Sequence, residues 1–338
     1  MDDTALPLFL PENRSVLFET LRQLDYDQIC KICGINREIN EYCQDNLQIK
    51  LLLISKRTDK LIVEHGNEYN TLIYASQKGD LDIVNELLER GVDPNANIPN
   101  NLSDPLIVHR NMYQTCEHPD YNGDHALIEA SRNGRLNIVN FMLERGVDPS
   151  IYNNLAIILA SLNGHLDIIN RLCEDQRVDS SDLQNIAVIF ASSKSDVDPI
   201  YNTIIMRLLD DPLVNPFTDD TFMGNMSCPD DINLMKRLLS DPRFDPSYDN
   251  NDCIRGATMH STLEIIDLLL ADPRVDPTYN NGWGIETLMN AAGRENKALI
   301  QRLLDIPAVR NNTPYLNDYV NYVNGTIERL PQHCYYYC

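Results

Sequence analysis

The chain has few basic residues and no long apolar run. Lys and Arg number 28 against 50 Asp and Glu, which gives the 338 residues a net charge of −22 at pH 7. That charge repels a phosphate backbone or an anionic membrane surface, so we expect neither nucleic acid nor membrane as a partner. Nowhere are there the roughly 18 consecutive apolar residues that a spanning helix needs, and the start, MDDTALPLFL, does not resemble a signal peptide.

Motifs for catalysis are missing as well. The sequence contains no Gly-rich phosphate loop, no Gly-x-Ser-x-Gly elbow and no His-Glu-x-x-His. Its many Asp residues stand mostly in Asp-Pro and Asn-Asn loop signals rather than as paired carboxylates. We therefore expect no enzymatic activity, no catalytic residue and no cofactor.

Cysteines are scattered and odd in number, at nine. This pattern favours reduced thiols over a disulfide scaffold, so we expect a soluble protein of the cytoplasm, with the nucleus as a further option. Cys30 and Cys33 stand at Cys-x-x-Cys spacing within a predicted helix, but no second pair follows at ligand spacing. We expect buried helical cysteines there rather than a zinc or redox site.

Two other clusters contain potential metal ligands. The first comprises His109, Cys116, His118 and His125, whose spacing fits no established zinc motif. A metal-dependent activity in this region is the enzymatic alternative. The second is the end of the chain, where His333, Cys334 and Cys338 stand in HCYYYC and a frayed aromatic tail is the preferred interpretation. We assign no metal site to either cluster.

The chain does contain a repeat. Its marker is Val-Asp-Pro or a variant after a Leu-Leu pair, beginning at positions 92, 147, 178, 214, 244 and 275 and fading at 309. Two short apolar segments precede each marker, as in TLIYASQKG and LDIVNELLERG of the first unit. The second segment has the spacing of an amphipathic helix, and Gly91 follows its last turn. Each unit is therefore predicted to be a helical hairpin.

These runs resemble the ankyrin repeat. The matching runs are NTLIYASQKGDLDIVNELLERGVD, HALIEASRNGRLNIVNFMLERGVD and NLAIILASLNGHLDIINRLCEDQRVD. The resemblance implies an all-α solenoid of about seven helix-loop-helix units over residues 69–312 that recognises another protein. The Thr-Pro-Leu-His turn of the family is mostly lost, so we expect a less regular stack.

Stacking of these short hairpins requires close approach of neighbouring helices. A small residue falls at the same place in most units, with Met226 in the fifth: Ala75, Ala130, Ala160, Ala191, Ala257 and Ala291. Asp-Pro is expected to end each hairpin, because proline lacks an amide proton. Two irregularities stand out, a long excursion at 95–121 and about five extra residues between the two helices of the fourth unit.

The variable positions are the candidate binding residues. In such a solenoid the loop tips and first helices form an extended concave surface. We predict that it comprises Tyr74, Gln77, Lys78, Glu129, Arg132, Asn133, Tyr152, Asn163, Tyr248, Tyr279 and Trp283. Exposed Tyr and Trp suit protein recognition because they offer apolar area with a polar group. The alternative is that the tyrosines pack against a neighbouring loop.

The first 55 residues do not follow the repeat. Three helical faces are predicted in them, and Asp25 and Asp27 stand where a helix start needs side-chain acceptors. The segment resembles an F-box, through Leu10-Pro11, Val16-Leu17, Leu21, Leu24, Asp27, Ile29, Cys33, Arg37, Ile39, Cys43 and Asp45. Gln48-Ile49 replaces the usual aromatic pair.

That resemblance implies docking on the adaptor subunit of a cullin-type ubiquitin ligase through Leu10, Pro11, Val16, Leu17, Leu21 and Ile29. Residues 56–68 are expected to be a linker, and residues 313–338 a cap with one helix from Leu316 to Arg329. The combination is similar in style to the repeat families of giant DNA viruses, which would place the protein in the host cytoplasm.

The functional expectation is a substrate-recognition subunit that brings a target protein to the ligase. One alternative is a scaffold or inhibitor without a ubiquitin link. In that case the N-terminal helices would only shield the apolar face of the first repeat.

Overall fold

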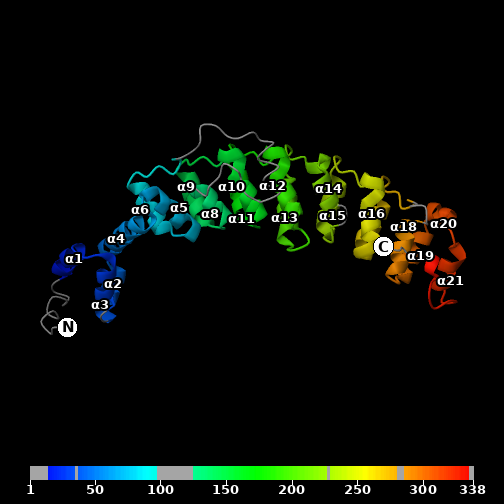
Figure 1. Ribbon diagram of the computed structural model, residues 1–338, viewed down its shortest axis with the longest axis horizontal. Helices are drawn as coiled ribbons and strands as arrows, with labels where there is room; N and C mark the ends of the chain where they lie inside the picture. Colours follow the sequence, from blue (N-terminus) through cyan, green and yellow to red (C-terminus); the bar gives the residue numbers. More distant parts are fainter. Residues whose placement is uncertain (1–13, 35–36, 97–124, 227–228, 280–284, 335–338) are drawn as a thin grey trace. The chain divides into compact units, whose positions relative to one another are not determined.

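The computed structural model describes residues 14–34, 37–96, 125–226, 229–279 and 285–334 (Figure 1). Every regular element in these ranges is helical. The chain divides into two compact units, Met1–Val178 and Asp179–Cys338. Within the described residues, no helix combines the length and apolar character needed to cross a membrane.

Four helices precede the repeats. They are α1 (Arg14–Arg22), α2 (Tyr26–Cys33), α3 (Arg37–Asp45) and α4 (Leu47–His65). Asp25 caps α2 as expected, since its Oδ1 accepts from Gln28 N at 2.8 Å while Gln28 Oε1 accepts from Asp25 N at 3.0 Å. The core of this N-terminal unit contains Leu17, Leu21, Ile29, Cys33, Cys43 and Ile49.

Helix α4 was not expected, because residues 56–68 were expected to be a linker. One continuous helix runs from Asn46, whose side chain caps its start, to Gly66 in the left-handed conformation (φ 87°). It packs against α2 and α3 on one side and against the first repeat on the other. Residues 56–65 are helical because the apolar residues of α4 pack against both the N-terminal helices and the first repeat.

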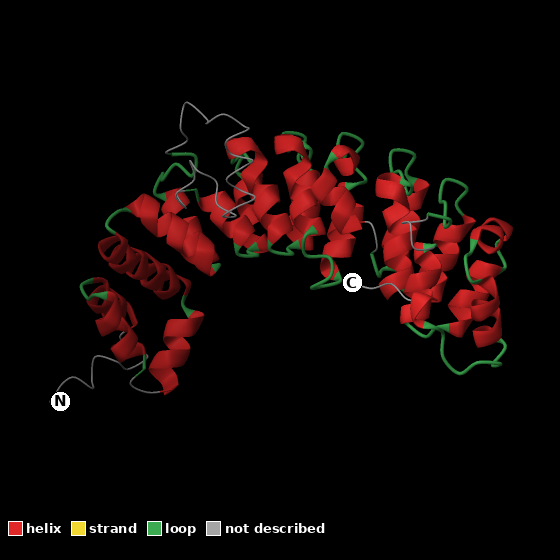
Figure 2. Cartoon of the chain, turned by 45° about the vertical axis from the view of Figure 1, so that its right-hand side comes forward, coloured by secondary structure: helices red, strands yellow, loops and turns green. Residues whose placement is uncertain are grey.

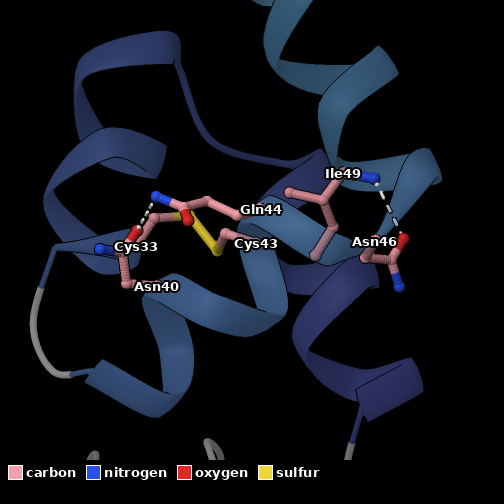
Figure 3. Close-up of a disulfide and its surroundings, with 6 residues drawn as sticks. All are labelled: Cys33, Asn40, Cys43, Gln44, Asn46 and Ile49. Carbon is pink, nitrogen blue, oxygen red and sulfur yellow. Dashed lines mark hydrogen bonds between the residues drawn. A yellow bond between two sulfur atoms is a disulfide. The ribbon is translucent and has the colours of Figure 1, made fainter.

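Cysteine chemistry also differs from expectation. Figure 3 shows a disulfide between Cys33 and Cys43, with Gln44 Nε2 donating to Asn40 Oδ1 at 3.1 Å beside it. The expectation of reduced thiols throughout is therefore wrong for this pair. Cys30 is a free thiol and is exposed, so the expectation of two buried cysteines is wrong there too.

Three hairpins follow in the first compact unit, Met1–Val178. They are α5 (Glu68–Lys78) with α6 (Leu81–Glu89), α8 (Ala126–Arg132) with α9 (Leu136–Glu144), and α10 (Ile151–Leu162) with α11 (Leu166–Cys173), visible in Figure 2. Their first helices pack side by side in the order α5, α8, α10. The expected excursion at 95–121 lies almost wholly outside the described residues.

Four more hairpins make up most of the second unit. They are α12 (Asp182–Ser192) with α13 (Ile200–Leu208), α14 (Asp220–Met226) with α15 (Ile232–Ser240), α16 (Tyr248–His260) with α17 (Leu263–Ala271), and α18 (Glu286–Gly293) with α19 (Lys297–Leu304). A short 3-10 helix, η3 (Pro216–Thr218), precedes α14. The connection between α12 and α13, residues 193–199, is longer than the others, as expected. The six alanines expected at the close approach of neighbouring helices are buried, and so is Met226 at the same place in the fifth repeat.

Three of the helix starts that follow a repeat marker share an unusual backbone. Three successive residues adopt positive φ at the start of α10 (Tyr152 to Asn154), α12 (Leu183 to Asn185) and α16 (Asp249 to Asn251). The third is always Asn, a residue that tolerates the left-handed region. In α12 and α16 its side chain reaches the following marker: Asn185 Oδ1 accepts from Asn215 N at 2.8 Å, and Asn251 Oδ1 accepts from Asp276 N at 2.6 Å.

The C-terminal end contains α20 (Pro307–Asn312), α21 (Leu316–Val323) and η4 (Gln332–Cys334). The expected helix to Arg329 is wrong in its end, because Gly325 adopts φ 74° just after Val323 and the chain turns away. The expected frayed tail is wrong through residue 334, since Cys334 is buried. Residues 335–338, including Cys338, lie outside the described part.

Candidate recognition surface

Five of the predicted surface residues lie together in the first unit. They stand at the C-terminal ends of α5, α8 and α10, where each repeat turns into its second helix: Gln77, Lys78, Arg132, Asn133 and Asn163. We call this set the turn edge. Glycines with positive φ, Gly79, Gly134 and Gly164, make those turns tight, which brings the helix ends of successive repeats into line. Their role in binding a partner stays a prediction.

Glu129 organises the turn edge from beneath. The residue is 3% exposed, so the expectation that it lies on the surface is wrong. Its Oε2 accepts a 2.9 Å hydrogen bond from Gln77 Nε2 of the preceding repeat. Its Oε1 lies 3.5 Å from Arg132 Nη1, and its carbonyl oxygen accepts from Asn133 Nδ2 at 2.8 Å. A buried carboxylate with donors from two repeats fixes the side chains above it.

Two further residues tie the turns to one another. Arg135 Nε donates to the carbonyl oxygen of Gln77 at 2.9 Å, and His165 Nε2 lies 3.0 Å from the carbonyl oxygen of Arg132. Sequence reasoning did not single them out. The signal was present, because Arg135 and His165 occupy the same place in successive units, after Asn-Gly. These bonds make the turn edge a fixed surface rather than a row of independent loops.

An aromatic and cationic patch adjoins the turn edge. The ring of Tyr74 stacks on His65, with centroids 4.1 Å apart, and the ammonium of Lys78 lies 5.7 Å from the centroid of the Tyr74 ring. Tyr74 is half-buried and Lys78 is exposed. Such a patch offers apolar area and hydrogen-bond donors to a protein partner.

The remaining predicted aromatics do not join this surface. Tyr152 is 2% exposed and stands at the start of α10, at the opposite end from Asn163, so its expected exposure is wrong. In the second unit, Tyr248 Oη donates to Asp220 Oδ1 at 2.5 Å, and Arg255 lies 5.1 Å from the centroid of the Tyr279 ring. These contacts fit the alternative of tyrosines packed against neighbouring elements. Trp283 lies outside the described residues.

The predicted adaptor-binding residues divide similarly. Leu10 and Pro11, and the side chain of Val16, lie outside the description, whereas Leu17, Leu21 and Ile29 are buried in the N-terminal core. Those three therefore hold the unit together and present no surface. Among the described side chains of this unit, the large exposed apolar ones lie on α4, where Leu47 and Leu51 are 68% and 54% exposed.

His125 is the one described member of the histidine and cysteine cluster around the excursion. It stands at the start of α8 and is 1% exposed. Burial lowers its pKa to about 4, against the opposing influence of Asp148 and Asp93. His109, Cys116 and His118 lie outside the described residues.

Comparison with known proteins identifies the repeat. The family model for a single ankyrin repeat matches residues 67–99, and the model for ankyrin repeats in three copies matches residues 100–183. The chain therefore contains ankyrin repeats, which indicate a protein-protein interaction module. The helical hairpins continue beyond the matched part to α19.

Among solved structures, an ankyrin repeat family protein from Legionella pneumophila is similar to this chain. The two are 20% identical over 90% of each chain, with a TM-score of 0.35. No curated protein matches.

Proposed function

We propose that this protein is a substrate-recognition subunit that links a target protein to a cullin-type ubiquitin ligase. The target would bind at the turn edge, and the ligase adaptor would bind on the N-terminal helices. The observation that carries the target half of this proposal is the set of bonds beneath Gln77 and Arg132. Ordered side chains lose little conformational entropy on binding, which is what a recognition surface requires.

Support for the adaptor half comes from the N-terminal unit. It has its own core and a capped second helix, in the segment that resembles an F-box. Because Leu17, Leu21 and Ile29 are occupied in that core, a partner would contact the exposed leucines of α4. Leu47 and Leu51 are one helical turn apart and so share a face. An exposed apolar pair of this kind suits a protein interface.

A binding titration of the full chain against a eukaryotic F-box adaptor subunit tests the adaptor half. We expect one-to-one binding with a Kd in the micromolar range or tighter. Leu51→Lys should weaken it by at least tenfold, because a charge is placed in the contact. Val63→Lys is the matched control, since Val63 is 83% exposed on the same helix but near its other end. Absence of binding by the unmutated chain would remove the ligase link.

The second candidate is a scaffold or inhibitor that binds a target without a ubiquitin link. The packing of α4 against α5 and α6 favours it, because α4 covers the first repeat as a terminal cap must. The two candidates share the turn edge and differ only in adaptor binding. An adaptor-negative chain that still binds a target at the turn edge is the outcome expected of the scaffold.

A further inference from the structure

Three groups of metal-ligating character meet near the C-terminal end of the second unit. Asp318 lies in the first turn of α21, while His333 and Cys334 lie in η4. One ligand atom from each lies within 4.8 Å of the others. His333 Nε2 and Asp318 Oδ2 are 2.9 Å apart. The fold thus brings together residues that stand fifteen positions apart in the sequence.

The surroundings hold these groups in place. Tyr319 Oη donates to the carbonyl oxygen of Cys334 at 3.1 Å, and Cys334 N donates to Pro331 O at 3.0 Å. The ring of Tyr315 lies against the ring of His333, with centroids 4.1 Å apart. Ligands that are oriented by outer contacts of this kind bind metals more tightly than ligands that must be ordered.

Exposure changes across the cluster. Cys334 is 0% exposed, whereas the side chains of Asp318 and His333 are 33% and 44% exposed. An ion can therefore approach from solvent through the carboxylate and the imidazole and reach the sulfur on the inner side. The fourth position of a tetrahedral ion would face solvent and take a water molecule.

We propose that Asp318, His333 and Cys334 form a binding site for Zn²⁺ or a metal of similar ligand preference. Thiolate, imidazole and carboxylate are the ligands that Zn²⁺ takes in proteins, at bond lengths of about 2.0–2.3 Å. Tetrahedral ligands at those lengths are about 3.3–3.8 Å apart, so side-chain shifts on the order of 1 Å complete the site. A thiolate ligand disfavours Mg²⁺ and Ca²⁺, which take oxygen ligands.

Binding would join η4 to α21, and α21 packs on α19 of the last repeat. The ion would therefore fasten the C-terminal cap over the end of the repeats and stabilise the folded chain by linkage. This role is independent of target and adaptor binding. The spacing of His333 and Cys334 alone did not predict it, because the third ligand comes from another helix.

A titration of the full chain with Co²⁺ under non-reducing conditions, after treatment with a chelator, tests the site. Co²⁺ is used because a cobalt-thiolate bond gives a charge-transfer absorption that a surface carboxylate does not. We expect one Co²⁺ per chain with that absorption, displacement by Zn²⁺, and no displacement by Mg²⁺. Cys334→Ser should abolish the absorption, and His333→Gln should weaken binding at least tenfold.

Cys30→Ser is the control, since Cys30 is a free and exposed cysteine in the other unit. It should leave the titration unchanged. His333→Gln alters an exposed side chain, so it tests the site even if Cys334→Ser disturbs the cap. Absence of the absorption from the unmutated chain, or its persistence unweakened in either the Cys334 or the His333 variant, would overturn the proposal.

Discussion

Arg274 Nη1 donates a 2.7 Å hydrogen bond to the carbonyl oxygen of Phe244, which belongs to the preceding repeat marker. The same guanidinium is held by Asp272, whose Oδ1 and Oδ2 accept from Nε and Nη2 at 3.0 and 2.7 Å. Arg243 repeats the arrangement with Asp241 and with the carbonyl oxygen of Val214 at 2.8 Å. The Asp-x-Arg motif thus connects successive repeats in a chain that has mostly lost the Thr-Pro-Leu-His turn.

Arg274→Gln is expected to lower the free energy of unfolding by about 1–2 kcal/mol, because it removes charge-assisted bonds to the previous repeat. Urea unfolding followed by circular dichroism measures the change. Arg310→Gln, at an exposed arginine of α20, is the control and should unfold like the unmutated chain. Equal urea midpoints for the Arg274 variant and the control would show that this hydrogen bond does not stabilise the folded chain.

Asp241→Asn should show how this joint depends on pH. Hydrogen bonds from Arg243 lower the pKa of Asp241 from 3.8 to about 2, so the folded state favours the carboxylate. Its contribution is therefore present above pH 3.8 and is lost as pH falls towards 2. At pH 7 we expect the variant to be less stable by about 1–2 kcal/mol, since Arg243 is partly exposed and the interaction is screened.

Urea midpoints measured from pH 7 down to pH 2 check that prediction, and the gap between variant and unmutated chain should close at the acid end. Asp196→Asn, in the exposed connection between α12 and α13, should show no gap at any pH. A gap for Asp241→Asn that stays constant down to pH 2 would contradict the assigned cause.

His125 predicts a second pH dependence, in a different range. Its folded pKa of about 4 lies below the ordinary 6.5, so the unfolded chain binds the proton first. Stability is then complete above pH 6.5 and declines as pH falls from 6.5 to 4, by at most about 3 kcal/mol. His125→Gln should remove this decline, and His260→Gln, at an exposed histidine, should retain it. The same loss of stability from pH 6.5 to pH 4 in both variants would show that His125 is not its cause.

Alkylation of the native, non-reduced chain tests the thiols. Iodoacetamide should modify the exposed Cys30 and should leave Cys33 and Cys43 unmodified until a reductant opens their disulfide. The buried Cys253 should react only after unfolding. Peptide mass spectrometry identifies each site. Modification of Cys33 or Cys43 without reductant would show that these two cysteines are free thiols, as the composition suggests.

Much of the repeat architecture was predictable because its marker is local. Leu-Leu before Val-Asp-Pro lies within one helix end and its loop, so the hairpins and the buried position of Ala130 follow from periodicity. The continuation of α4 through residues 56–65 was not predictable, since its apolar residues serve two packing surfaces and break the simple period. Which face such a helix covers is decided by its neighbours.

The candidate site was predictable in part. Lys78, Asn133 and Asn163 share a repeat position, each directly before a Gly, so their common edge follows from the period. The burial of Glu129 and Tyr152 does not, because a charged or aromatic side chain in a variable position is ordinarily exposed. Bonds from a neighbouring repeat permit the burial of Glu129, and the sequence does not state where those donors lie.

Photo-crosslinking at the turn edge shows whether this surface recognises another protein. A photoreactive residue is placed at Lys78, the exposed end of α5, or at Glu89, the exposed end of α6 in the same repeat, and the full chain is irradiated in eukaryotic lysate. We expect a discrete adduct from position 78 that excess unmodified chain abolishes, and no such adduct from position 89. The same adducts from both positions, or none from position 78, would contradict it.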